Sequence, residues 1–144
     1  MTATTCERTV LVVEDDREVR DAIAEVLADF EYKALEASNG VEALHKLRTA
    51  STRPCLILLD VMMPGMDGWE FRAEQKRDPT VKDIPVILLS AHTDVKSAAE
   101  QMNAAGFLAK PIGVDMLLKI VERFCVLDQK GAAGGKAPAQ SGGT

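Results

Sequence analysis

Residues 56–68 read LILLDVMMPGMDG, and this stretch decides the fold of the chain. Four apolar residues run directly into Asp60, and two turn signals, Pro-Gly and Asp-Gly, follow. An unbroken apolar run bounded by turn residues is typical of a strand buried on both faces of a parallel sheet. Asp60 is therefore predicted at the carboxyl end of a strand, the edge where open α/β sheets bind ligands. Taken alone, this aspartate has a plainer explanation, because aspartate often begins a turn.

The composition limits the classes of protein to consider. The chain has 144 residues, enough for one domain with a sizeable core. With 17 Lys+Arg against 22 Asp+Glu, its net charge of -5 argues against direct binding of nucleic acid. No apolar stretch approaches the roughly 20 residues that span a bilayer, and the first residues lack the apolar segment of a signal peptide. We therefore expect a cytoplasmic location and no membrane insertion.

The three cysteines, Cys6, Cys55 and Cys125, are widely separated and show no metal-binding spacing. An odd number of distant cysteines indicates reduced thiols, as in the cytoplasm. Cys55 and Cys125 are predicted to be small buried apolar residues.

Strand and helix patterns alternate five times along the chain. Strands are predicted at 9–13, 32–37, 55–59, 84–89 and 107–109, and helices at 17–30, 41–48, 69–76, 93–102 and 113–127. Each connection is long enough to hold a helix, so the strands should be parallel with helices on both faces. The predicted fold is therefore a doubly wound, flavodoxin-like (βα)5 sandwich of three layers, with sheet order 2-1-3-4-5.

Three further expectations follow from local composition. Residues 1–7 are expected to be an N-terminal extension, 8–127 the domain and 128–144 a flexible Gly- and Ala-rich tail. The third helix has a thin apolar face, because Gln75 stands where a helical stripe would place another apolar residue. Asn103 can end the fourth helix in the left-handed conformation.

Polar residues follow four of the predicted strands, at what should be a single edge of the sheet. Glu14, Asp15 and Asp16 follow the first strand, and Asp60, Ser90 and Lys110 end or follow the third, fourth and fifth. Clustered carboxylates repel one another unless a cation offsets them, and a few hard oxygen ligands suit Mg²⁺. An aspartate can act as a nucleophile and become an aspartyl phosphate. A lysine and a hydroxyl can then hold the oxygens of the transferred phosphoryl group.

Four motifs together resemble the receiver domain of two-component response regulators, the CheY-like superfamily. They are VVEDD at 12–16, LLDVMMPGMDG at 58–68, LSA at 89–91 and FLAKP at 107–111. The resemblance covers about residues 8–127. It implies that Asp60 accepts a phosphoryl group from a phosphohistidine on a histidine kinase or phosphotransfer protein. The chain would then be a phosphoacceptor and not an enzyme in the ordinary sense.

The resemblance also assigns roles to the other site residues. Asp15 would bind Mg²⁺ directly and Glu14 mainly through water, with Asp60 and the backbone carbonyl of Met62 completing the protein ligands. Ser90 and Lys110 would hold the phosphoryl oxygens.

A second group of residues would carry the switch. Phe107 takes the place of the aromatic residue that turns inward when the Ser90 hydroxyl moves. Ser90 replaces the commoner threonine, and Asn103 stands where the family often has glycine. Met62 and His92 would flank the site and control access of water to the phosphate, with Met62 expected to have the larger effect.

Several alternatives stay open at this point. Asp16 and Asp67 are more simply explained as helix caps than as ligands. A phosphatase of the haloacid-dehalogenase type would need an acid at position 62, which is Met62. A pseudo-receiver that has lost the chemistry would lack one of the motif residues, and none is missing.

The last helix carries more apolar surface than one core contact requires. Its core stripe is predicted to contain Val114, Leu117, Val121 and Phe124, and its second stripe Met116, Ile120 and Leu127. We therefore expect self-association or partner binding through the last two helices and Phe107. Because no output domain is evident, the chain is expected to be a stand-alone receiver that acts on a downstream protein or relay.

Overall fold

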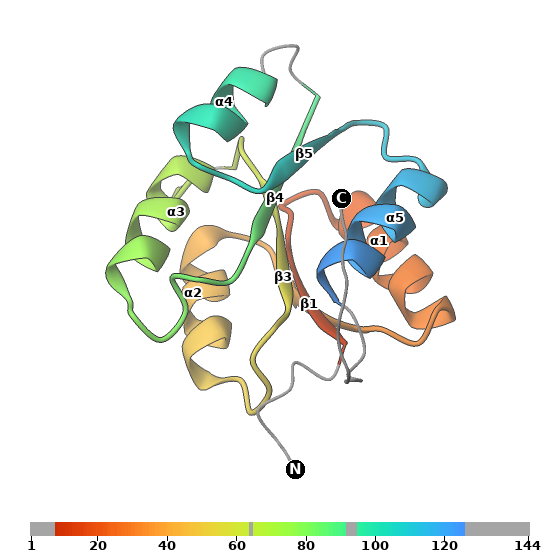
Figure 1. The fold of residues 1–144 in the computed structure, drawn as a ribbon, viewed down its shortest axis with the longest axis horizontal. Helices are drawn as coiled ribbons and strands as arrows, with labels where there is room; N and C mark the ends of the chain where they lie inside the picture. The colour runs from red at the N-terminus through yellow and green to blue at the C-terminus, as the bar shows by residue number, and fades with distance from the viewer. Residues whose placement is uncertain (1–7, 64, 92–94, 126–144) are drawn as a thin grey trace.

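The computed structural model describes residues 8–63, 65–91 and 95–125. Strands and helices alternate within these ranges (Figure 1): β1 (Thr9–Val13), α1 (Arg17–Asp29), β2 (Lys33–Ala37), α2 (Gly40–Thr49), β3 (Leu56–Asp60), α3 (Gly68–Arg77), β4 (Val86–Ser90), α4 (Val95–Gln101), β5 (Gly106–Ala109) and α5 (Val114–Phe124). Predictions for the extension at 1–7, for His92 and for Leu127 and the tail concern residues outside the described ranges.

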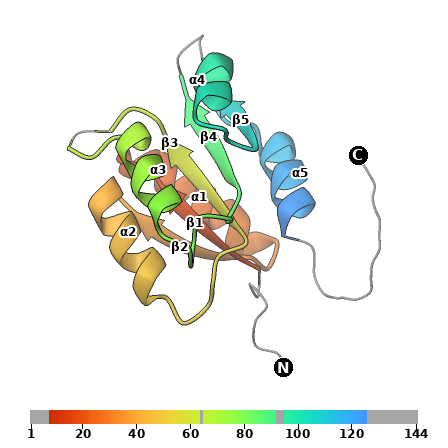
Figure 2. The ribbon, with the colours of Figure 1, turned by 60° about the vertical axis from the view of Figure 1, so that its left-hand side comes forward.

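All neighbouring strands pair in parallel, in the order β2-β1-β3-β4-β5. The predicted doubly wound, flavodoxin-like fold is therefore confirmed. Helices α2, α3 and α4 cover one face of the sheet, and α1 and α5 cover the other (Figure 2). None of the helices in the described residues is both long and apolar enough to cross a membrane.

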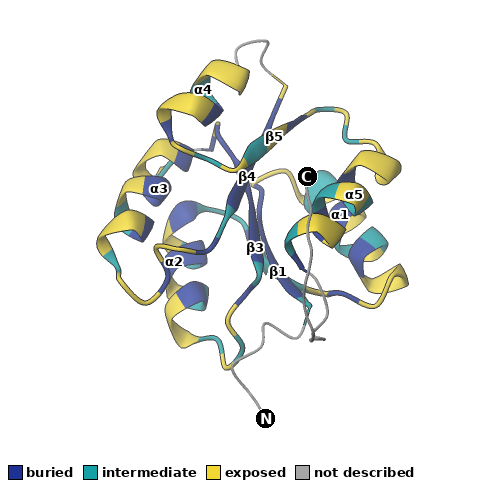
Figure 3. Ribbon diagram, in the orientation of Figure 1, coloured by how far each residue is buried: buried dark blue, intermediate teal, exposed yellow. Residues whose placement is uncertain are grey.

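The three central strands explain the continuous apolar runs in the sequence. Every residue of β1, β3 and β4 is buried (Figure 3). Along β1, Leu11 and Val13 pack toward α2, α3 and α4, whereas Val10 and Val12 pack toward α1 and α5. Strands with helices on both faces need apolar residues at every position, since each fully buried Val, Leu or Ile side chain contributes about 1.5–3 kcal/mol.

Two polar side chains of α3 are buried and hold neighbouring elements together. The Arg72 guanidinium donates from Nε to the Met102 carbonyl at 3.0 Å, from Nη2 to the Asn103 carbonyl at 2.7 Å and from Nη1 to Gln75 Oε1 at 2.8 Å. No carboxylate pairs with Arg72 among the described residues, and burial lowers the pKa of its guanidinium. The guanidinium pairs instead with the backbone carbonyls at the C-terminal end of α4, which carry partial negative charge. Asn103 has φ 56°, which confirms its predicted left-handed conformation.

Gln75 explains the thin apolar face of the third helix. Its side chain is completely buried, and Nε2 donates to the carbonyls of Val81, at 2.9 Å, and Ile84, at 3.1 Å. These two hydrogen bonds give partners to two backbone carbonyls of the segment that leads into β4. Without Gln75, these carbonyls would be buried with no hydrogen bond from this side chain. The expected apolar residue is therefore replaced by a fully hydrogen-bonded polar one.

The prediction of reduced cysteines is wrong for Cys55 and Cys125. The two residues form a disulfide with Cα atoms 5.4 Å apart, although 70 positions separate them in sequence. The topology explains the contact. Cys55 precedes β3 and Cys125 follows α5, and in a βα fold the starts of strands and the ends of helices lie at the same edge of the sheet. Cys125 is buried against the apolar residues of that face, as predicted, whereas Cys55 packs against them but is only partly buried.

Candidate phosphorylation site

The carboxyl edge of the sheet brings the predicted acidic residues together. Glu14 directly follows β1 and is completely buried, Asp60 ends β3 and is 4% exposed, and Asp15 is exposed. Oxygen atoms of these three carboxylates lie within 4.8 Å of one another. Because β1 and β3 are neighbours in the sheet, residues at their ends must meet.

Lys110 reaches the same cluster from the end of β5. Its Nζ lies 2.8 Å from Glu14 Oε1 and 3.6 Å from Asp60 Oδ2. The backbone N–H of Lys110 donates to the Ser90 carbonyl at 2.9 Å, which joins the ends of β4 and β5. Ser90 is buried on β4, the strand next to β3. Five residues predicted from the strand ends therefore lie at one edge, with Lys110 in contact with two of the acids.

The loop after β3 positions Asp60 from the other side. The backbone N–H of Met62 donates to Asp60 Oδ1 at 3.3 Å. Gly68 begins α3 so close to this loop that a Cβ atom there would lie 2.9 Å from the carbonyl oxygen of Asp60 and 2.9 Å from the Cα of Val61. Only glycine fits at this position, which explains the Asp-Gly pair in the sequence.

Two further acids at this edge, Asp16 and Asp67, are helix caps. Asp16 Oδ1 accepts from the N–H groups of Glu18 and Val19 at the start of α1. Asp67 and Glu70 form a reciprocal capping box at the start of α3. Both interpretations from the sequence are confirmed, since a capping carboxylate satisfies N–H groups that have no partner within the helix.

The site carries an excess of negative charge. The pKa of Asp60 is raised to about 8, first by burial and further by hydrogen bonds with Glu14 and Asp15 and by the charge of Glu14, while the charge of Lys110 acts to lower it. Burial lowers the pKa of Lys110, but its contacts with Glu14 and Asp60 outweigh this, so the net shift is upward. The ammonium therefore stays charged and pairs with two of the three clustered acids, Glu14 and Asp60.

The donor set fits the magnesium ion that the resemblance implies. Glu14, Asp15 and Asp60 offer hard carboxylate oxygens within 4.8 Å of one another, and Lys110 neutralises only part of their charge. Mg²⁺ prefers few protein oxygens and keeps waters in its shell. Asp15 is exposed, which suits a partly hydrated ion.

The residues expected to switch or flank the site lie on its outer side. Phe107, on β5, is 39% exposed, and Met62 is 58% exposed. Phe107 therefore faces solvent in this structure. Met62 offers no polar side-chain atom beside Asp60 that could hold a water molecule well. His92 lies outside the described residues.

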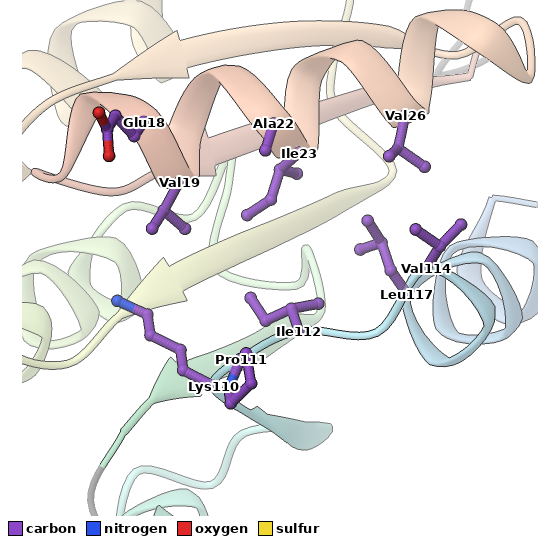
Figure 4. A pocket seen from close by; sticks show the side chains of 10 residues that line it. All are labelled: Glu18, Val19, Ala22, Ile23, Val26, Lys110, Pro111, Ile112, Val114 and Leu117. Atoms are coloured by element: carbon purple, nitrogen blue, oxygen red, sulfur yellow. The ribbon is translucent and has the colours of Figure 1, made fainter.

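An apolar groove that sequence reasoning missed opens beside Lys110. It has a volume of about 310 Å³ and lies between α1 and the segment that leads into α5. Val19, Ile23 and Val26 of α1 face Ile112 and Val114 across it, with Lys110 at one end (Figure 4). The apolar spacing on α1 was visible in the sequence, but the spacing alone did not show that part of this stripe would remain uncovered.

The raised pKa of Asp60 predicts how stability depends on pH in metal-free protein. The pKa is 3.8 for an ordinary aspartate and about 8 in the fold, so between these pH values the folded state binds one more proton than the unfolded state. Stability should therefore fall as the pH rises from about 4 to about 8 and change little above that. Asp60→Asn removes this group. With a chelator present, we expect its stability advantage over the native chain to be larger at pH 8 than at pH 5, by on the order of 2 kcal/mol.

Urea unfolding at the two pH values measures this difference. Asp16→Asn, which changes an exposed capping acid at the same edge, is the control and should show no such pH-dependent gain. An equal advantage of Asp60→Asn at pH 5 and pH 8 would contradict the prediction.

Known proteins share both the sequence and the fold of this chain. The family model of the response regulator receiver domain matches residues 10–122. The phosphate regulon transcriptional regulatory protein PhoB of Pseudomonas aeruginosa is 35% identical over 138 residues, which cover 94% of this chain and 58% of that protein. The response regulator MprA of Mycobacterium avium is 39% identical over 111 residues, covering 76% of this chain and 47% of that protein. The chain thus spans about half the length of these curated relatives.

Solved structures agree. The Vibrio cholerae chemotaxis protein CheY4 is 33% identical, with a TM-score of 0.74, and the match covers 81% of this chain and 97% of that one. A response regulator from Chloroflexus aurantiacus is 29% identical, with a TM-score of 0.75, over 82% of this chain and 97% of that one. From the family model, the relatives and the shared fold, we conclude that this chain belongs to the response regulator receiver family of two-component systems.

Proposed function

We propose that this chain is a signalling switch in which Asp60 accepts a phosphoryl group from a phosphohistidine of a histidine kinase or phosphotransfer protein. The observation that carries the proposal is the position of Asp60. It ends β3 among the oxygens of Glu14 and Asp15, with the ammonium of Lys110 3.6 Å away. A nucleophile, a site for a cation and a fixed positive charge are the parts that phosphoryl transfer needs.

The chemistry follows from these parts. An Asp60 oxygen attacks phosphorus, a P–O bond forms, and the bond from phosphorus to the histidine nitrogen of the donor breaks. The Lys110 ammonium, which pairs with Asp60 and Glu14 in this structure, then binds one of the phosphoryl oxygens. The Ser90 hydroxyl binds another phosphoryl oxygen. Glu14, Asp15, Asp60 and the backbone carbonyl of Met62 would hold Mg²⁺. When bound, the ion neutralises the charge that develops on the phosphoryl oxygens.

The donor protein needs a surface beside Asp60. The apolar groove between α1 and α5 has Lys110 at one end, so a donor seated on it would lie next to the phosphoacceptor (Figure 4). We propose that this exchange takes place in the cytoplasm and that the chain passes the signal to a downstream protein or relay without binding nucleic acid itself.

Labelling with a small phosphodonor tests the proposal without a protein partner. Acetyl phosphate and Mg²⁺ should add one phosphoryl group, which hydroxylamine should release because it cleaves acyl phosphates. Peptide mapping should place the group on Asp60. A label on any other residue, or equal labelling with a chelator present, would overturn the assignment.

The lifetime of the phosphorylated state depends on access of water to phosphorus. Met62 is bulky, apolar and 58% exposed, two residues after Asp60, so it excludes water and cannot orient it. We predict loss of the phosphate over minutes to hours, and a severalfold shorter lifetime for Met62→Asn, whose amide can position a water molecule. His92→Ala should have a smaller effect. Phosphate release after removal of acetyl phosphate measures these lifetimes, and a native lifetime of seconds would contradict the prediction.

The outer face of α4, β5 and α5 is proposed to bind a partner or a second copy of the chain. Phe107 is 39% and Met116 54% exposed. Val114, which was predicted for the core stripe, is 48% exposed and borders the groove on the α1 side instead. Ile120 packs partly against the core, so a charge there would disturb the fold as well as the face.

Met116→Glu is therefore the cleaner test of this face. We expect it to leave unfolding and acetyl phosphate labelling unchanged and to weaken association of the phosphorylated chain at least tenfold, as measured by sedimentation. Lys119→Gln, on the exposed surface of the same helix, lowers the net charge by the same single unit without removing an apolar residue. An equal loss in both variants would assign the effect to charge and contradict an apolar contact.

A further inference from the structure

The structure ties the segment from Lys110 to Cys125 to β3 at both edges of the sheet. Cys55 begins the segment that becomes β3 and ends at Asp60, and Cys125 ends the helix whose chain begins just after Lys110. At the carboxyl edge, Lys110 lies 3.6 Å from Asp60. At the opposite edge, the disulfide joins Cys55 to Cys125. Strand β3 and the segment from Lys110 to Cys125, which contains α5, are therefore joined by an ion pair at one end and by a covalent bond at the other.

Helix α5 has few buried residues and no side-chain cap at its start. Only Leu117 and Val121 are buried within the helix, with Cys125 directly after it. At its start, Gly113 provides no side-chain cap, whereas α1, α2 and α3 are each capped by a side chain. A helix with a narrow buried stripe and an uncapped start is weakly held, so a covalent link at its end constrains it strongly.

The surroundings of the two sulfurs also accommodate the reduced form. Cys125 is 2% exposed and Cys55 is partly exposed, and both pack against the apolar cluster that α1 and α5 cover. Free cysteines behave as small apolar residues in such places, so the pair can exist as thiols without leaving an unpaired charge. The unequal exposure also fixes the order of the chemistry, since a reagent reaches Cys55 first.

We propose that Cys55 and Cys125 are a reversible thiol–disulfide site that locks the end of α5 to the base of β3 when oxidised and releases it when reduced. In the oxidation, the Cys55 thiolate attacks a small disulfide such as oxidised glutathione, forming a mixed disulfide and releasing one thiolate. The Cys125 thiolate then attacks Cys55 Sγ and releases the second. Two protein thiols are oxidised to one disulfide, one glutathione disulfide is reduced to two thiols, and the two protons pass to the released thiolates. A dithiol reverses both steps.

Hydrogen exchange of the full chain, oxidised with glutathione disulfide or reduced with dithiothreitol, tests the lock. Oxidation should remove two hydrogens and leave the Cys6 thiol as the one that alkylates. Amides in the last turns of α5, including the Cys125 N–H that bonds to the Val121 carbonyl, should exchange at least tenfold faster after reduction. Exchange in β1, β3 and β4 should not change. Equal exchange of α5 in the two forms would overturn the proposal, as would a disulfide that the dithiol cannot reduce while the chain is folded.

Two variants separate the disulfide from other effects of the reagents. Cys55→Ala changes the partly exposed partner and leaves Cys125 in the core, so its α5 amides should match the reduced native chain under both conditions. Cys6→Ser is the matched control and should keep the full redox response. A persistent response in Cys55→Ala would overturn the assignment. These readouts involve no phosphate, so they can fail while the proposed function stands, and the reverse.

Discussion

Replacing Asp60 by asparagine is expected to abolish labelling of the chain by acetyl phosphate. The amide has nearly the same shape as the carboxylate but cannot attack phosphorus, and it also removes one of the three acids that would hold Mg²⁺. Loss should be complete within detection, which makes this the largest effect expected for any substitution. Intact-protein mass spectrometry after incubation with acetyl phosphate and Mg²⁺ measures it.

A matched substitution guards against a general effect of removing negative charge from this edge. Asp16 lies two residues after Glu14 and caps α1, a role that asparagine also fills well. Asp16→Asn should therefore label at nearly the native rate. If Asp60→Asn still gains a phosphoryl group, another residue is the acceptor and the proposed chemistry is wrong.

Arg72→Met is expected to lower the free energy of unfolding by about 3 kcal/mol, the largest loss of stability outside the sheet. Methionine can fill the space of the arginine stem but leaves three acceptors without donors. Two of these bonds, to the Met102 carbonyl and to Gln75, are buried, where water cannot replace the guanidinium. Removing the buried charge also gives back the free energy that its desolvation cost. This gain is smaller for arginine than for other cations, because guanidinium is weakly hydrated.

Urea unfolding at pH 7 measures the loss as a shift of the midpoint at an unchanged slope. Lys76→Met makes the same kind of change at an exposed position of α3 and should stay within about 0.5 kcal/mol of the native chain. Arg72→Lys keeps the charge but loses the planar guanidinium with its several donors. It should therefore recover only a small part of the free energy of unfolding that Arg72→Met loses. A native-like midpoint for Arg72→Met would mean that other groups hold α4 in place.

The part of the fold that could be predicted from sequence is the part governed by local pattern. Four apolar residues before Asp60 specify a buried strand, and repetition of strand and helix leaves few topologies open. Once the strands are parallel, their ends must meet, so the acids and Lys110 could be placed together. Asp16 and Asp67 were also correctly identified as caps, because capping depends on residues only a few positions away.

The features that the sequence did not reveal depend on distant packing. Gln75 broke an apolar stripe, but which carbonyls it would satisfy depends on how the chain enters β4. The Cys55–Cys125 contact joins residues 70 positions apart, and cysteine type alone does not distinguish a buried thiol from a disulfide. Val114 lies on the same helical stripe as the buried Leu117 and Val121, yet its end of the stripe is left uncovered and borders the groove. Helical periodicity identifies one face of a helix but not how much of that face its neighbours cover.

Close packing at Gly68 limits how receivers of this type can diversify. Because the first turn of α3 packs against the backbone of Asp60 and Val61, any larger residue at position 68 would shift Asp60, the proposed phosphoacceptor. The start of α3 and the position of Asp60 therefore cannot be altered independently. New partner preferences along α3 must arise from its outward-facing positions, such as Trp69 and Ala73. Mutational libraries that leave position 68 unchanged can explore that surface without disturbing the chemistry.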